Sequence, residues 1–272
     1  MGASEASAAD RSQWLKNTTH INVVFTAACN TELLRDLLGW LNLQSTSPAT
    51  DEQLERHLNQ LERRREGLDG LPEMWRISGQ MRAVFTTPRH FMRSYTFAEF
   101  DLGAGRLIVS LDLLNAGGEL GFPDEVGDVA EIFWVGAKEE AAESSGDRER
   151  RRQTERARVR QLVRDIVRDF DVRFVFGGHV SFVSRYVRWL QRSRSHVKPR
   201  RALPWEFLWP LTYLPECSLD EAALKGLPVH YAERVASGAL IEVFEDLHMG
   251  YQDDYVDAAH ALGLRAVWEL KP

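Results

Sequence analysis

Residues 156–176 read RARVRQLVRDIVRDFDVRFVF, and this stretch carries the clearest structural pattern in the chain. Apolar side chains recur in its first fifteen residues at the spacing of one helix face. They are Val159, Leu162, Val163, Ile166, Val167 and Phe170. Residues 172–176 form a short apolar run typical of a strand, and Gly177 and Gly178 predict a turn after it. The stretch therefore predicts a helix over residues 156–170 that leads into a strand.

The rest of the chain repeats this mixture of helices and strands. Residues 20–28 predict an apolar strand, and Asn30 caps a following helix whose inner face is rich in leucine. Thr50 and Gln53 form a capping box for a second helix. Residues 180–191 fit either a helix or a strand. Further strands are expected at residues 82–86, 94–101, 106–113, 128–136, 211–214, 229–234 and 239–245. A last helix is expected at residues 252–262, with Tyr255, Val256, Ala259 and Leu262 facing inward.

The connections between these elements predict the fold class. Most strands follow one another after short turns, which favours antiparallel pairing. We therefore expect an α+β fold in which helices pack on an antiparallel or mixed sheet. Residues 1–14 are small and polar and predict a flexible tail. Residues 15–272 predict one large domain, built as one body or as two lobes.

Composition limits the class of protein. With 272 residues, of which 44% are hydrophobic, the chain can bury a sizeable core without disulfides. Cys29 and Cys217 have the spacing of neither a zinc site nor a disulfide framework, so we expect two buried thiols. The N-terminus lacks the pattern of a secretory signal, and no run approaches the roughly 18 apolar residues of a membrane span. These features predict a cytoplasmic protein that does not contact membranes.

Catalytic motifs are absent from the sequence. It contains no GxSxG elbow, Walker loop or HExxH pair, so we expect no enzyme activity, no cofactor and no metal. The alternative is an enzyme whose site is assembled from distant residues. The turn expected at residues 176–179 would expose His179 as a general base, with Asp112 and one of the late carboxylates as further members of the site. His248 and His260 lie near such carboxylates.

Charge is unevenly distributed along the chain. Residues 172–205 hold eight basic and no acidic residues, whereas residues 206–272 hold twelve acidic and four basic residues. The basic belt from Arg185 to Arg201 would suit a nucleic-acid-binding adaptor, because aromatic side chains interleave it. They are Tyr186, Trp189 and Trp205. The net charge of −6 argues against nucleic acid as a partner, and the belt more simply neutralises the acidic end.

The acidic end predicts a contact surface for a basic partner. Opposed charges steer two proteins together, and tyrosines beside carboxylates are typical of interfaces. Carboxylates at the start of a helix also complement its dipole, which is the structural alternative. The candidate contact residues are Glu245, Asp246, Tyr251, Asp253, Asp254, Tyr255 and Asp257.

The order of elements resembles that of the polymorphic-toxin immunity proteins of family fifty-two. Residues 21–43 match its first strand and leucine-rich helix, and residues 97–115 match a pair of strands in the middle of the chain. The long helix at residues 156–170 then leads into an apolar strand, as in the family. Near the C-terminus, the stretch Trp209-Pro210-Leu211-Thr212-Tyr213-Leu214 looks like the family's Trp-x-Thr-Tyr strand.

This resemblance implies a function. It suggests a single-domain α+β inhibitor without catalytic activity that neutralises one cognate toxin of a bacterial secretion system, such as the type VI system. Such toxins are often nucleases, whose substrate groove is basic. An acidic end on the inhibitor would then occlude the active site of the toxin.

Overall fold

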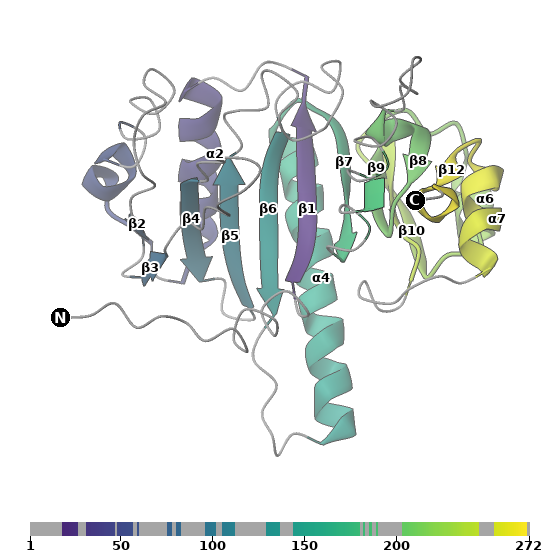
Figure 1. Ribbon diagram of the computed structural model, residues 1–272, viewed down its shortest axis with the longest axis horizontal. Coiled ribbons are helices and arrows are strands. Elements are labelled where there is room, and N and C mark those ends of the chain that lie inside the picture. The colour runs from purple at the N-terminus through teal and green to yellow at the C-terminus, as the bar shows by residue number, and fades with distance from the viewer. Residues whose placement is uncertain are drawn as a thin grey trace.

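The protein folds around one large antiparallel sheet (Figure 1). The computed structural model describes residues 18–26, 31–46, 48–56, 59, 75–77, 80–82, 96–101, 105–111, 129–136, 144–179, 182, 185–186, 189, 203–244 and 253–270. The eight strands lie in the order β10-β11-β9-β7-β1-β6-β5-β4. In that order their bounds are Tyr231–Val235, Gly238–Glu242, Leu211–Leu214, Val172–His179, Thr18–Phe25, Val129–Gly136, Gly105–Leu111 and Thr96–Asp101. The predicted α+β class is confirmed.

Two short strand pairs accompany the sheet. Strands β2 (Trp75–Ile77) and β3 (Gln80–Arg82) pair antiparallel. Strands β8 (Phe207–Leu208) and β12 (Arg265–Ala266) pair in parallel and join the C-terminal segment to the residues just before β9.

Strand β1 lies at the centre of the large sheet. It pairs antiparallel with β6 on one side and with β7 on the other. Ile21, Val23 and Phe25 point into one hydrophobic cluster, and Val24 points into a second cluster on the opposite face. This alternation follows from the two-residue period of a strand.

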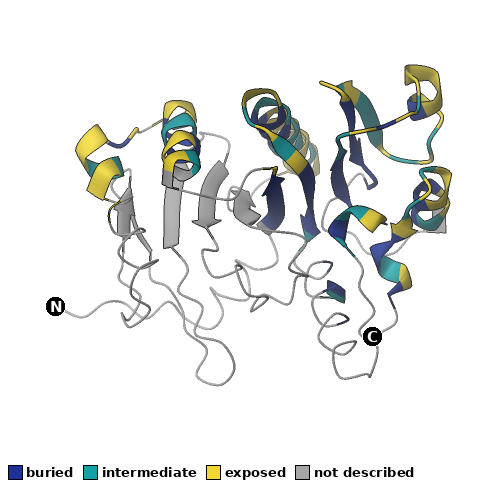
Figure 2. Ribbon diagram, turned by 90° about the horizontal axis from the view of Figure 1, so that it is seen from above, coloured by how far each residue is buried: buried dark blue, intermediate teal, exposed yellow. Residues whose placement is uncertain are grey.

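Helices α2 (Thr31–Gln44) and α4 (Ser145–Asp169) cover the first face of the sheet (Figure 2). The predicted stripe on α4 is confirmed, since Val159, Leu162, Val163, Ile166 and Val167 are all buried. Phe170 is half-buried at the end of the helix and meets the ring of Phe25 edge-on, with 6.1 Å between centroids.

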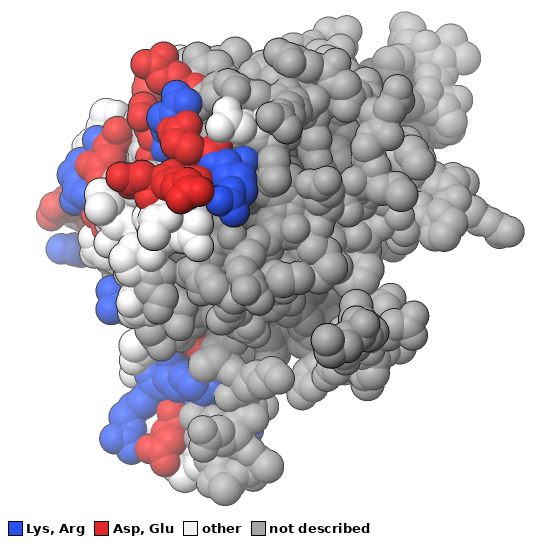
Figure 3. All heavy atoms as spheres, turned by 90° about the vertical axis from the view of Figure 1, so that its left-hand side faces the viewer, with Lys and Arg blue, Asp and Glu red and all other residues white. Residues whose placement is uncertain are grey.

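Helix α4 begins eleven residues earlier than the sequence pattern predicts. Ser144 caps it, because its Oγ accepts a hydrogen bond from the Asp147 amide at 3.1 Å. The first half carries no apolar stripe and is supported by local pairs such as Arg150 with Asp147 at 2.7 Å. It extends past the end of the sheet in Figure 1, and Figure 3 shows charged side chains on this projecting end.

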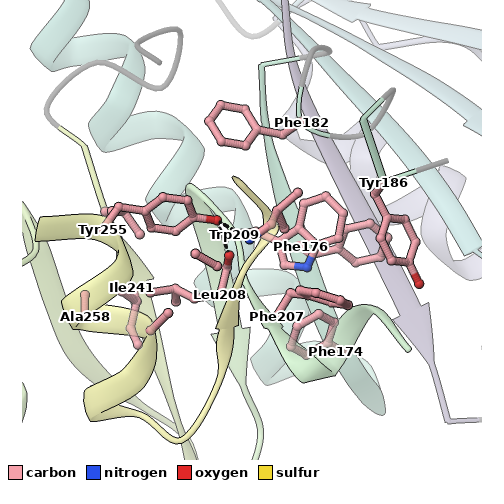
Figure 4. Close-up of a cluster of buried hydrophobic side chains, with 14 of the residues drawn as sticks. Phe174, Phe176, Phe182, Tyr186, Phe207, Leu208, Trp209, Ile241, Tyr255 and Ala258 are labelled. Atoms are coloured by element: carbon pink, nitrogen blue, oxygen red, sulfur yellow. Dashed lines mark hydrogen bonds between the residues drawn. The ribbon is translucent and has the colours of Figure 1, made fainter. Parts of the chain in front are cut away.

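The opposite face of the sheet carries a cluster rich in aromatic side chains (Figure 4). Phe176 of β7 contacts Trp209, with 4.6 Å between ring centroids. The described residues of segment 180–191 are helical, and three of them are buried in this cluster. They are Phe182, Tyr186 and Trp189, at helical spacing. Of the helix and the strand that the sequence allowed for this segment, the structure thus has the helix at the described residues.

Several local predictions are confirmed. Thr50 and Gln53 exchange the two hydrogen bonds of a capping box, at 2.8 and 3.3 Å. Strands β4, β5 and β6 form the expected antiparallel meander. The predicted tail at residues 1–14 lies outside the described residues. Among the described residues, no helix combines the length and the apolar character that crossing a membrane requires.

One prediction is wrong: Gly177 and Gly178 do not form a turn but continue β7 to His179. A Cβ atom on Gly177 would lie 2.1 Å from the carbonyl oxygen of His20 in β1. Gly178 has a φ of +139°, and a Cβ atom there would lie 2.8 Å from the ring of Pro210. The two glycines therefore permit close approach of neighbouring backbone.

We predict that Gly177→Ala lowers the free energy of unfolding by about 2 kcal/mol or more, because β1 must move to admit the methyl group. Gly39 is the matched control, since its Cβ position in α2 has no neighbour within 4 Å. Gly39→Ala should raise the free energy of unfolding by roughly 0.5–1 kcal/mol. Urea titration measures both, and an equally stable Gly177→Ala variant would contradict the packing argument.

Candidate protein-interaction surface

Two helices of the C-terminal part are fixed on the aromatic cluster. Helix α6 (Glu221–Lys225) contributes Leu224, and α7 (Asp253–Ala261) contributes Tyr255, Ala258 and Ala259. Asp220 caps α6 by accepting a hydrogen bond from the Ala223 amide at 2.8 Å. The buried side chains of both helices thus fix the position of their exposed residues.

Tyr255 belongs to the aromatic cluster and not to the surface. Its ring is fully buried, and its hydroxyl donates to the Leu208 carbonyl and accepts from the Val267 amide at 2.9 Å (Figure 4). Burial raises the pKa of this hydroxyl above its ordinary value. The predicted inward position is confirmed, but the predicted contact of Tyr255 with a partner is corrected, because the side chain cannot reach one.

Asp257 of α7 is exposed, as a contact residue must be. Glu216, in the loop before α6, is exposed as well. Neither carboxylate has a hydrogen bond or an ion pair in the part of the chain that the structure describes. Glu221 is exposed and lies 3.9 Å from Lys225, a weak surface pair.

The structure does not describe the side chains of the other predicted contact residues. Asp253 and Asp254 start α7, but their side chains lie outside the described part of the structure. Glu245, Asp246 and Tyr251 also lie outside it.

A different acidic residue is buried between α4 and the sheet. Glu242 of β11 has no exposed surface, and its Oε2 lies 2.8 Å from Arg160 and 3.6 Å from Arg156. Burial raises the pKa of this carboxyl, and the two arginines oppose the shift. Glu242 therefore joins α4 to the C-terminal half of the sheet through a buried charge cluster.

A second ion pair extends this cluster toward the edge of the sheet. Arg164 pairs with Glu233 of β10 and donates to the Tyr231 hydroxyl at 2.6 Å. The guanidinium of Arg160 also stacks over the Tyr231 ring, 4.5 Å from its centroid. Sequence reasoning missed this cluster, although Arg156, Arg160 and Arg164 recur every four residues along one side of the helix.

The described arginines of the basic region, residues 172–205, make structural contacts. Arg173 stacks over Trp205 at 4.1 Å, and Arg185 stacks over Trp268 at 4.4 Å. Arg185 also donates to the Leu270 carbonyl at 2.9 Å. Since Tyr186 and Trp189 are buried in the core, they are not available to stack on nucleic-acid bases.

The structure describes the residues of the alternative enzyme site only in part. His179 is half-buried at the end of β7, opposite Thr19 of β1, and Asp112 and His248 lie outside the described residues. His260 is exposed and lies 3.4 Å from Glu269. The described side chains contain no group of three His, Cys, Asp or Glu residues able to hold a metal.

Comparison of the sequence with protein-family models and with curated proteins finds no match.

We predict that Tyr255→Phe lowers the free energy of unfolding by about 1–3 kcal/mol, because the buried groups of Leu208 and Val267 lose their partner. Chemical denaturation measures the change. Tyr231→Phe is a control, since Tyr231 is only half-buried and should cost less. A Tyr255→Phe variant as stable as the wild type would show that these hydrogen bonds contribute little.

We also predict a specific pH dependence from Glu242. Its raised pKa means that the folded protein binds a proton at this site more tightly than the unfolded chain does. The wild type should therefore gain stability relative to Glu242→Gln as the pH falls from about 7 toward 5. Unfolding titrations at several pH values test the sign. A wild type that loses stability relative to the variant would show that the arginines outweigh burial.

Proposed function

We propose that this chain is a non-catalytic immunity protein that neutralises a basic protein toxin by docking on the carboxylates of its C-terminal surface. The observation that carries the proposal is the contrast between two sets of acids. Glu242 and Glu233 are neutralised by arginines of α4. Glu216 and Asp257 remain exposed and unpaired within the described structure.

Unpaired surface carboxylates suit an interface with a cationic partner. They raise the local concentration of that partner and accelerate association at low salt. They also avoid the cost of breaking existing ion pairs when the complex forms. The charges on α2 and on residues 51–56 differ in this respect, because Arg35 pairs with Glu55 and Arg56 pairs with Glu52. Figure 3 shows both signs mixed on that side of the molecule.

The packing beneath the C-terminal surface supports the same role. Tyr255 and its buried hydrogen bonds hold α7 against the β8–β12 pair, so the helix needs little ordering on binding. Preorganised surfaces bind more tightly than flexible ones of the same composition, because less entropy is lost. The resemblance in element order to immunity proteins of family fifty-two suggests that the partner is a toxin. The C-terminal carboxylates would then occlude the substrate groove of that toxin.

Co-expression with the product of the adjacent gene tests this function. That product should arrest growth alone, and the chain should restore growth and be captured with it in a one-to-one complex. If the neighbour is harmless, or if the purified chain instead retains nucleic acid or converts a small molecule, the immunity function is refuted.

Charge reversal tests the docking surface. In Glu216→Lys/Asp257→Lys, the association rate with the captured toxin should fall about tenfold or more at low salt. The matched control is Glu32→Lys/Asp36→Lys, which changes the net charge equally at exposed sites of α2 on the far side of the molecule. Stopped-flow kinetics measure both. Equal rates for the two variants would remove the C-terminal carboxylates from the interface.

A further inference from the structure

Strand β10 forms an edge of the large sheet. It pairs with β11 alone, and no described strand lies beyond it. A two-residue turn joins the two strands, so Val235 and Gly238 form a hydrogen-bonded pair. Such pairs alternate along an antiparallel ladder, so Glu233 also bonds to β11. Ala232 and Arg234, which alternate with these residues, direct their N–H and C=O groups away from the sheet.

The outward backbone groups of β10 remain open. Neither Ala232 nor Arg234 makes a backbone hydrogen bond on that side within the described structure. At the start of the strand this pattern ends, because the His230 amide donates to the Val243 carbonyl at 3.1 Å. The edge thus offers N–H donors and C=O acceptors at two positions, which is how a sheet accepts a further strand.

Strand β10 lacks the usual protection of an edge strand. Proline, lysine and bulges discourage pairing with another chain. Residues 231–235 read YAERV, and their register with β11 is unbroken. Glu233 pairs with Arg164 of its own chain. The guanidinium of Arg234 donates to the Leu219 carbonyl, so both charged side chains of β10 are already held within the molecule.

Both faces of β10 are already packed. On the side of α4, the guanidinium of Arg160 stacks over Tyr231, 4.5 Å from the ring centroid. On the opposite side, Ala232 packs against the aromatic cluster, which includes Leu224 of α6. A further strand would therefore meet the edge of β10 and not one of its faces.

We propose that β10 pairs antiparallel with β10 of a second copy of this chain, joining two sheets across a two-fold axis. With the axis at Glu233, the N–H and C=O groups of Ala232 meet those of Arg234 in the second copy. The open groups of both edges are then all paired. Contacts of this symmetric kind are the commonest among protein dimers.

The side chains of β10 suit this register. Tyr231 lies opposite Val235 of the second copy, and aromatic residues pair favourably with β-branched ones. The two copies of Glu233 lie opposite each other, but each brings Arg164 as its counter-ion. A guanidinium has five N–H donors, so each Arg164 can bind both carboxylates. The charges at the centre of the contact are therefore balanced.

The dimer does not depend on the proposed function, and its formation can be measured on the full chain. Analytical ultracentrifugation from about 1 μM to 1 mM should show reversible conversion of monomer to dimer. Ala232→Pro removes an outward N–H without breaking a bond to β11, and its ring blocks an added strand. It should raise the dissociation constant of the dimer about tenfold or more, because two hydrogen bonds are lost. The matched control, Ala232→Gly, keeps the N–H and should dimerise as the wild type does.

Amide hydrogen exchange of the wild type is a second measurement that needs no variant. The amides of Ala232 and Arg234 should exchange slowly in the dimer and rapidly after dilution to the monomer, whereas the Glu233 amide should be protected in both. A chain that stays monomeric, a dimer that a folded Ala232→Pro variant leaves intact, or edge amides that exchange alike in both states would overturn the proposal. Protection of these amides only by a captured toxin would also overturn it, because the toxin would then occupy the edge.

Discussion

The pairing of β1 with both β6 and β7 is the constraint on which the rest of the structure depends. It joins the meander of β4, β5 and β6 to the C-terminal strands β7, β9, β11 and β10. It also fixes which side chains of β1 enter each of the two cores, since a shift of one residue would exchange them. Gly177 is part of this constraint, because only a residue without Cβ admits the backbone of His20 at that distance.

The acidic residues of the C-terminal part fall into two groups, according to whether they lie under α4 or on the surface. Where α4 lies on the sheet, carboxylates are neutralised by arginines of the helix, and Glu242 is buried among them. Breaking such a buried cluster is costly, so it favours one position of α4 over others. Farther along the chain, the carboxylates at Glu216 and Asp257 face outward without partners in the described structure. The acidic excess of the C-terminal part therefore has two separate physical roles.

Local patterns in the sequence predicted much of the fold. The apolar stripe of α4 and the capping box at Thr50 depend on residues a few positions apart, so periodicity and spacing were sufficient. The glycines of β7 misled the prediction, because each is required by a residue distant in the sequence: Gly177 lies against His20, 157 positions away, and Gly178 lies against Pro210. The parallel β8–β12 pair was missed for a similar reason, since two-residue strands carry no periodic signal.

The candidate surface was predictable only in part. A run of acidic residues identified the region, and Asp257 is exposed there. Helical periodicity predicted that Tyr255 faces inward, whereas its place in the acidic run made it a contact candidate as well, and its burial in the second core supports only the first prediction. Composition could not show that Glu242 is internal, since the carboxylate gains its partners only when α4, some 80 positions earlier, lies over β11.

The central position of β1 has a consequence for how the chain is made. Asn22 and its partner Phe176 are 154 positions apart. At the usual pace of about 5–20 residues per second, a ribosome needs roughly 8–30 s to deliver the second neighbour of β1 after the first residues emerge. During that interval an apolar strand has at least one open edge, which favours binding by a chaperone. Because of this topology, β1 is translated long before its partner β7, and β9, β11 and β10 can join the sheet only after β7.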